Sequence, residues 1–265
     1  MAEGSPPTAS HSRLFDLLRR AGREESSTVG FGRPRQASVR RPELALLAAL
    51  PTLGAGMVGA ARESRVDAAL LPVQADQTLE RPSVEADWPL VAWPRSSRPL
   101  SGADVDGWMA AGMDAAALRP RDCLAACFSP RRRGMYAHLD QAIELDGLRA
   151  AALLPVEGFF LEVAGRDPRL GGDELLWIAL AVAAVRGPAV VLSNRIVAED
   201  LEALVATGAA GVAIGFPSDA DAAAVQKRLA ELRTAVDSLD PHLRREAHEH
   251  RGDTPVVIPF RGTSN

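Results

Sequence analysis

The chain lacks the features that define several large classes of protein. Its only two cysteines, Cys123 and Cys127, are too few for a disulfide framework, and no further Cys or His at short spacing completes a zinc site. No run approaches the ~18 apolar residues of a membrane span, and residues 1–11 lack a signal-peptide core. A net charge of −4 is not the basic balance of a nucleic-acid binder. We therefore expect a cytoplasmic protein that binds neither nucleic acid nor membranes.

Lysine is almost absent as well. Lys227 is the only lysine among 30 basic residues, and it lies on the outer face of a predicted helix near the end of the chain. Schiff-base chemistry needs a lysine amine inside the site, so the sequence argues against a class I aldolase or a pyridoxal phosphate enzyme. Gly-x-Ser-x-Gly, His-Glu-x-x-His and Walker motifs are also missing.

What the chain does contain is a repeated alternation of apolar runs and helical stretches. Short apolar runs of this kind are typical of parallel strands buried on both faces. Eight units predict a single α/β domain, a (β/α)8 TIM barrel over residues 12–239, with a doubly wound open sheet as the alternative. The expected strands are 44–50, 68–73, 90–93, 115–118, 135–139, 159–163, 189–192 and 212–216, and the expected helices between them are 55–64, 104–112, 146–154, 173–186, 197–207 and 219–239.

The remaining segments fit less regularly. An amphipathic helix over 13–23, capped by Ser12, is expected before the first strand. The connections 74–87 and 121–134 are weak helices, and 124–128 within the second is a candidate extra strand. Residues 1–11 are expected to be disordered, and the polar residues 240–265 to form a flexible tail.

In such a barrel the site forms at the carboxyl ends of the strands. Asp140 and Glu162 end the fifth and sixth strands, where two carboxylates could act in catalysis and hold Mg²⁺ together with substrate oxygens. The alternative is structural: Glu162 pairs with an arginine such as Arg166, and Asp140 caps a loop. His138, within the fifth strand, is expected to be an interior histidine.

The last quarter of the chain carries a resemblance. Residues 190–195, 199–204 and 207–215 resemble the closing two units of the phosphate-binding TIM-barrel families, which include flavin mononucleotide oxidoreductases and aldolase-like barrels. The resemblance implies that Gly215 binds a phosphate through its backbone, with Ser218 nearby. Ser193 and Asn194 stand where many relatives carry a glycine pair, and Arg195 would compensate for their side chains by contacting the anion directly.

Arginines also cluster after the fourth strand. Arg119 and Arg121, followed by three arginines at 131–133, suit a phosphate or carboxylate ligand, although such a run can equally be a solvated surface. The sequence therefore predicts a barrel that binds a small anionic ligand, phosphorylated or carboxylated, at the strand ends. A metal-assisted lyase using Mg²⁺ and a flavin oxidoreductase using FMN are the enzyme classes in view. The alternative is a non-catalytic regulatory or scaffolding subunit, and a homo-oligomer is compatible with either.

Overall fold

The computed structural model describes residues 11–21, 43–75, 79, 87–165, 167–240 and 243. Eight parallel strands close into a barrel in chain order, which confirms the predicted fold and excludes the open sheet. Every predicted strand is present with its bounds within one residue of the expected ones. The strands are β1 (Ala45–Ala49), β2 (Ala68–Val73), β3 (Leu90–Pro94), β4 (Ala115–Leu118), β5 (Met135–Asp140), β6 (Gly158–Glu162), β7 (Ala189–Ser193) and β8 (Gly211–Gly215).

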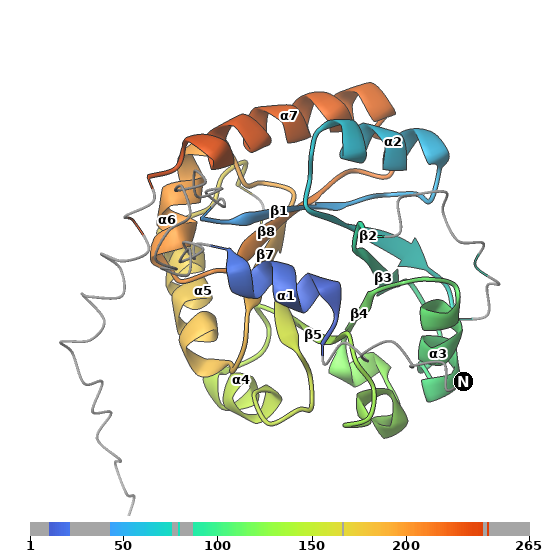
Figure 1. Cartoon of the computed structure of the whole chain (residues 1–265). Helices are drawn as coiled ribbons and strands as arrows, with labels where there is room; N and C mark the ends of the chain where they lie inside the picture. The colour runs from blue at the N-terminus through green and yellow to red at the C-terminus, as the bar shows by residue number, and fades with distance from the viewer. Residues whose placement is uncertain are drawn as a thin grey trace, which may run out of the picture.

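Helices surround the strands in a ring, as Figure 1 shows. They are α2 (Ala55–Glu63), α3 (Gly102–Ala110), α4 (Leu145–Ala151), α5 (Gly172–Ala184), α6 (Leu201–Ala206) and α7 (Ala222–Ser238). Helix α2 packs beside α7 and α4 beside α5. None of the helices in the described ranges is long and apolar enough to cross a membrane.

The connection between β4 and β5 departs from the repeat. It forms two 3-10 turns, η1 (Pro120–Asp122) and η2 (Ala125–Phe128), so the expected extra strand at 124–128 is wrong. Its only strand-like pairing is an isolated bridge between Leu100 and Cys123. Leu124 is 52% exposed, unlike the residues of the eight strands, almost all of which are buried. Most of the other weak connection, 76–78 and 80–86, lies outside the described residues.

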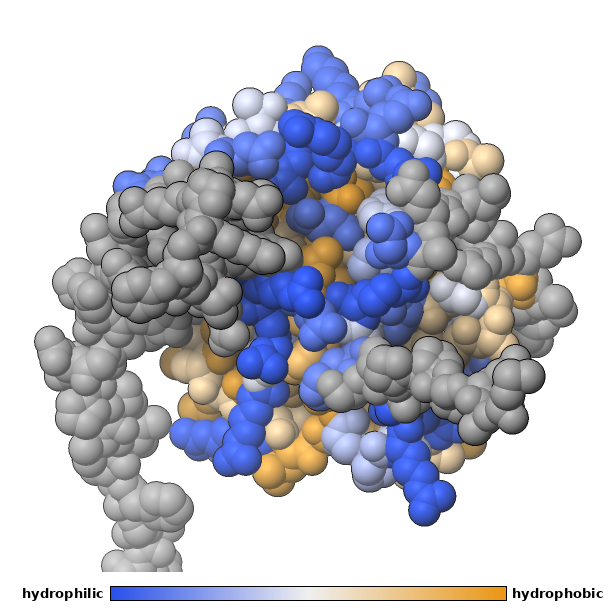
Figure 2. All heavy atoms as spheres, in the orientation of Figure 1, coloured by the Kyte–Doolittle hydropathy of each residue, from blue (hydrophilic) through white to orange (hydrophobic). Residues whose placement is uncertain are grey.

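Helix α1 (Arg13–Arg20) closes the N-terminal end of the barrel, and it lies across that opening in Figure 1. The Ser12 side chain accepts a hydrogen bond from the Phe15 N–H and caps the helix, as the sequence predicts. Leu14 and Leu18 are fully buried among residues that begin the strands, such as Ala45. Figure 2 shows the same end of the molecule, with hydrophilic residues gathered around α1. With this end closed, the opposite end remains for a site.

The barrel interior is apolar along most of its length. Small side chains such as Ala49, Ala68 and Ala213 face the large rings of Tyr136 and Phe160, and together they form one buried cluster with α1. The predicted terminal segments cannot be compared with the structure, because residues 1–10, 241–242 and 244–265 lie outside the described part of the chain.

Candidate functional site

Polar side chains enter the barrel interior at the C-terminal ends of β4, β5 and β6. Side chains alternate along a strand, so His138 and Glu162 lie on the interior side, two residues after Tyr136 and Phe160. Arg119 follows β4 and has the same relation to the interior residue Ala117. We call Arg119, His138 and Glu162 the mouth cluster.

The mouth cluster is held together by one carboxylate oxygen. The Arg119 guanidinium and Nε2 of His138 both contact Oε2 of Glu162, the latter at 3.1 Å. The contact with His138 and the positive charge of Arg119 lower the pKa of Glu162 to about 2, although burial acts in the opposite direction. Glu162 is therefore ionised at neutral pH. The His138 Nε2 atom is buried, and its contact with Glu162 is not in good hydrogen-bond geometry.

A cavity of about 210 Å³ opens beside Arg119 and His138. Trp93 and Arg95, from the end of β3, line it on the other side. The Arg95 guanidinium carbon lies 4.0 Å from the centroid of the Trp93 ring, a cation–π contact. No carboxylate of the described residues pairs with Arg95. The cavity therefore combines two cations and one carboxylate, Asp122, with an aromatic ring and a buried histidine.

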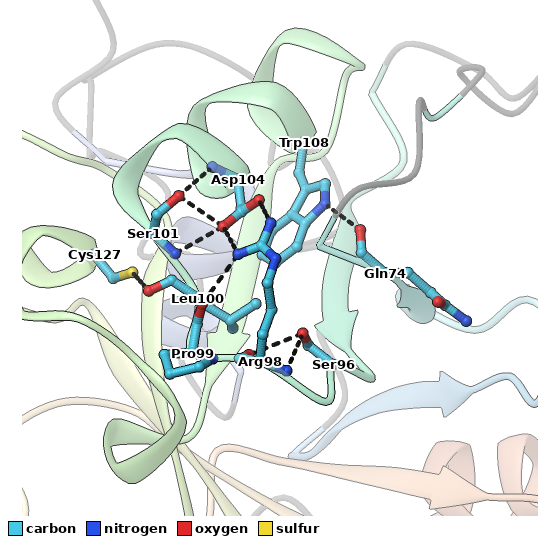
Figure 3. Close-up of polar contacts among 9 residues, drawn as sticks. All are labelled: Gln74, Ser96, Arg98, Pro99, Leu100, Ser101, Asp104, Trp108 and Cys127. Carbon is cyan, nitrogen blue, oxygen red and sulfur yellow. Dashed lines mark hydrogen bonds and ion pairs between the residues drawn. The ribbon is translucent and has the colours of Figure 1, made fainter.

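The loop between β3 and α3, which carries cavity residues Ser96 and Leu100, is fixed by polar contacts (Figure 3). Arg98 forms a two-armed ion pair with Asp104, at 3.0 and 2.7 Å. The Asp104 carboxylate also accepts from the backbone N–H of Ser101, and the Ser101 hydroxyl accepts from the Asp104 N–H. The hydrogen bonds from Arg98 hold the pKa of Asp104 well below its usual value. This wall of the cavity is therefore in place before any ligand arrives.

A second cavity, of about 450 Å³, meets the first at Arg119 and His138. It lies along α4, on the side where 3-10 turns replace the helix between β4 and β5. Arg121 lines it and pairs with Asp140, with Nη2 and Oδ2 3.1 Å apart. The rest of its lining is largely apolar: Leu139, Ile143, Gly147, Ala150, Ala151 and Leu154.

The predicted residues after β7 lie in a different environment. Arg195 is 7% exposed and pairs with Glu174 at 2.5 Å. Its Nη1 also donates to the backbone carbonyls of Asp167 and Arg169, at 3.2 and 2.9 Å. Ser193 is buried, and its hydroxyl accepts from the Arg195 N–H at 3.3 Å. The side chains of Ser193 and Arg195 are therefore already engaged in contacts within the protein.

Asn194 and Gly215 line a third cavity, of about 420 Å³, between the ends of β7 and β8. Two carboxylates, Asp219 and Asp221, and one arginine, Arg228, also line it. Asp221 caps α7 by accepting from the Ala224 N–H at 2.7 Å, so a carboxylate already occupies the helix N-terminus. Ser218 is exposed on the same loop. The nearby acidic groups oppose the binding of an anion at this edge of the barrel.

The carboxylates predicted to hold Mg²⁺ are neighbours in the sheet. Asp140 and Glu162 are register partners in β5 and β6. Each is already held by a guanidinium, Asp140 by Arg121 and Glu162 by Arg119. The described residues contain no cluster of three or more His, Cys, Asp or Glu side chains that could bind a metal. This donor set does not fit a magnesium ion, and the acidic surroundings of Gly215 do not fit the phosphate of FMN. Arg166 lies outside the described residues.

Sequence reasoning missed part of this arrangement. Arg95 was not among the expected site residues, although it comes directly after the end of β3. Extending the strand-end rule by one residue would have found it. His138 was expected to be a satisfied interior histidine, and the structure places it inside the barrel but beside a cavity.

Comparisons with known proteins agree on the fold and give no family. Neither a protein-family model nor a curated protein sequence matches the chain. Tryptophan synthase from Mycobacterium tuberculosis matches in structure with a TM-score of 0.54 and 16% identity, covering 85% of this chain and 98% of that one. Phosphoribosyl anthranilate isomerase from Thermus thermophilus matches with a TM-score of 0.53 and 12% identity, covering 74% and 100%.

A third similar structure is thiamine phosphate pyrophosphorylase from Pyrococcus furiosus, with a TM-score of 0.51 and 18% identity. It covers 73% of this chain and 95% of the other. At these identities the likeness concerns the fold alone. The class of protein that the strands and helices define is therefore a single-domain (β/α)8 barrel.

Proposed function

We propose that this barrel binds a small anionic ligand, phosphorylated or carboxylated, in the cavity beside the mouth cluster. The observation that carries the proposal is the pairing of two accessible cations, Arg95 and Arg119, with a buried histidine in one small cavity at the strand ends. Two of the structurally similar enzymes bear names that contain a phosphorylated compound, which agrees with this ligand class.

Arg119 retains binding capacity despite its ion pair. Its guanidinium has five N–H donors, and only the Nη2 group contacts Glu162. No other described residue accepts a hydrogen bond from the Arg119 side chain, which is 34% exposed. Planar guanidinium groups bind carboxylate and phosphate oxygens through two parallel N–H groups, so an anion can add to the side of Arg119 that faces the cavity.

The cavity also limits the size of the ligand head group. About 210 Å³ is below the ~300 Å³ at which pockets for drug-sized molecules begin, so it suits a phosphate or a short carboxylic acid rather than a flavin. An ionised carboxylate in contact with a histidine is an arrangement that general acid–base catalysis uses, and His138 lines the cavity. A lyase that needs a proton transfer is one reaction class compatible with this pair, with His138 as the proton-handling group and Glu162 orienting it.

One observation favours the second candidate, a non-catalytic regulatory or scaffolding barrel. Three of the arginines expected to bind the ligand already pair with carboxylates: Arg119, Arg121 and Arg195. In a scaffold these pairs would serve only to fix the strand ends. The two candidates differ in whether anions stabilise the folded state.

Thermal unfolding with added inorganic phosphate tests the proposal. A ligand at ~100 times its Kd stabilises the native state by about 2.7 kcal/mol, so phosphate should raise the Tm. The Arg119→Gln variant should lose most of this rise. Arg186→Gln is a matched control, because Arg186 is exposed and precedes β7 at the opposite end of the barrel. An equal rise in all three proteins, or none in the wild type up to tens of millimolar phosphate, would overturn the proposal.

A further inference from the structure

The larger of the two cavities that meet at the mouth cluster has a mainly apolar lining. We call it the α4 groove, lined by Leu139, Ile143, Gly147, Ala150, Ala151 and Leu154. In the regular units a helix covers the outside of the sheet beside each strand. Between β4 and β5 the chain forms only 3-10 turns, and the groove lies beside α4 on this side.

Close packing shapes the wall of the groove. A Cβ atom on Gly147 would lie 2.6 Å from Cγ1 of Ile143, so the Ile143 side chain rests directly on the helix backbone. Ala150 is exposed, and Leu154 is half-buried. Apolar surface left open to water in this way is stabilised by an apolar partner.

Only one end of the groove is charged. Arg119 and His138 lie there, shared with the smaller cavity, and the Arg121–Asp140 pair stands beside them. Two arginines line the groove, and Arg119 keeps N–H donors that its contact with Glu162 does not use. The groove therefore pairs an end that carries guanidinium donors with an apolar channel of about 450 Å³, which is within the ~300–1,000 Å³ range of small-molecule sites.

We propose that the ligand of this barrel is amphipathic: a carboxylate or phosphate bound at Arg119, joined to an unbranched apolar chain of several carbons that lies in the α4 groove. The inference rests on the proposed function, because it uses the same anion site. The unused guanidinium donors of Arg119 argue for this occupant, since a ligand with one anionic end matches both these donors and the apolar walls. The groove is of small-molecule size, and a helix from a protein partner is the competing occupant.

A series of straight-chain carboxylates distinguishes these possibilities. Binding of acetate, butanoate, hexanoate and octanoate to the full chain is measured by titration calorimetry, below the concentrations at which the longer acids form micelles. Burial of one methylene contributes about 0.8 kcal/mol, so the affinity should rise about fourfold for each methylene that enters the groove. Arg119→Gln should weaken the whole series, because it removes the shared head-group contact.

Ala150→Trp fills the groove from an exposed helix position. We expect it to keep the affinity for acetate and to abolish the increase with chain length. Ala183→Trp, at an exposed position on α5 outside the groove, is the matched control and should behave as the wild type. Thermal unfolding establishes that both variants fold.

The outcomes separate the inference from the proposed function. If acetate and phosphate bind through Arg119 but the affinity is independent of chain length, the inference fails, the proposed function stands and a protein partner becomes the better occupant. A chain-length effect that survives both Arg119→Gln and Ala150→Trp reflects binding elsewhere and also overturns the inference. No binding of any anion overturns both.

Discussion

Arginines lie at two edges of the barrel mouth, and they differ in how far they are exposed and in how many contacts they make. At the β4–β6 edge, Arg119 is 34% exposed and makes a contact through one nitrogen. At the β7–β8 edge, Arg195 is 7% exposed, and it makes contacts with Glu174 and with two backbone carbonyls. The first arginine borders a cavity, whereas the second joins the loops after β6 and β7.

The difference shows what makes an arginine at a strand end a candidate ligand group. Both residues have the same charge and a similar position, so neither property determines which of them can bind a ligand. That depends on how many N–H donors remain after the internal contacts, together with the charge of the neighbouring groups. The cavity at the β7–β8 edge is lined by two carboxylates, Asp219 and Asp221, and one arginine, Arg228. The small cavity at the other edge is lined by two arginines, Arg95 and Arg119, and one carboxylate, Asp122.

We expect the largest difference between the two edges in the free energy of unfolding of their arginine variants. Arg195→Ala removes the partner of a largely buried carboxylate and should lower the free energy of unfolding by about 3 kcal/mol. Arg119→Ala should cost about 1 kcal/mol or less, because Glu162 keeps its contact with His138. Urea unfolding measures both. Equal losses would show that the two arginines have the same structural role.

Acid should destabilise the β4–β6 edge through Glu162. Its pKa falls from 4.5 to about 2 on folding, so ionisation of this group stabilises the native state above pH 4.5. That contribution, up to about 3 kcal/mol, is lost as the pH falls from 4.5 through 2. Glu162→Gln lacks the titrating group and should show a correspondingly shallower loss of unfolding free energy over this range. Parallel pH curves for the two proteins would contradict the pairing.

A double variant tests whether the acidic groups cause the difference between the two edges. Asp219→Asn and Asp221→Asn together remove both carboxylates from the β7–β8 edge, and asparagine at position 221 still caps α7. The double variant should gain a stabilisation by phosphate of about 1 kcal/mol at several times the Kd, additional to the wild-type response. The gain should persist when Arg119→Gln is added. If no gain appears, acidic neighbours are not what keeps anions from this edge.

The smallest effect is expected from divalent metals. Because Asp140 and Glu162 are each held by an arginine, calorimetric titration with Mg²⁺ and Mn²⁺ should give no heat that depends on Glu162. Comparison of the wild type with Glu162→Gln measures this. Tight binding that the substitution removes would restore the metal-assisted lyase as the favoured function.

The barrel itself was predictable from the sequence because each of its strands is buried on both faces. Such strands appear as short apolar runs, and all eight runs were found. The segment 124–128 was misassigned for the same reason, since Leu124 to Phe128 is also apolar. Its hydrophobic character reflects the burial of Cys127, whose thiol donates to the Leu100 carbonyl at 3.2 Å, and not a place in the sheet.

The ion pairs were harder to predict than the strands. The sequence placed Glu162 at a strand end and offered an arginine as its partner, but the partner in the structure is Arg119, 43 residues away. Which cation meets which carboxylate depends on the register of neighbouring strands and on which side chains point inward. Apolar runs locate a strand within a residue or so, whereas a shift of one residue turns each side chain to the opposite face.

Helix α1 has a consequence for how the protein is made. Its N-cap residue Ser12 donates its hydroxyl hydrogen to Glu157, a residue 145 positions later in the chain. At ~5–20 residues per second, translation reaches that partner roughly 7–30 s after Ser12 has been added. During this interval the strands against which Leu14 and Leu18 pack are incomplete, and the apolar side of α1 is exposed to other molecules. Helix α1 is thus synthesised well before the residues that hold it in place.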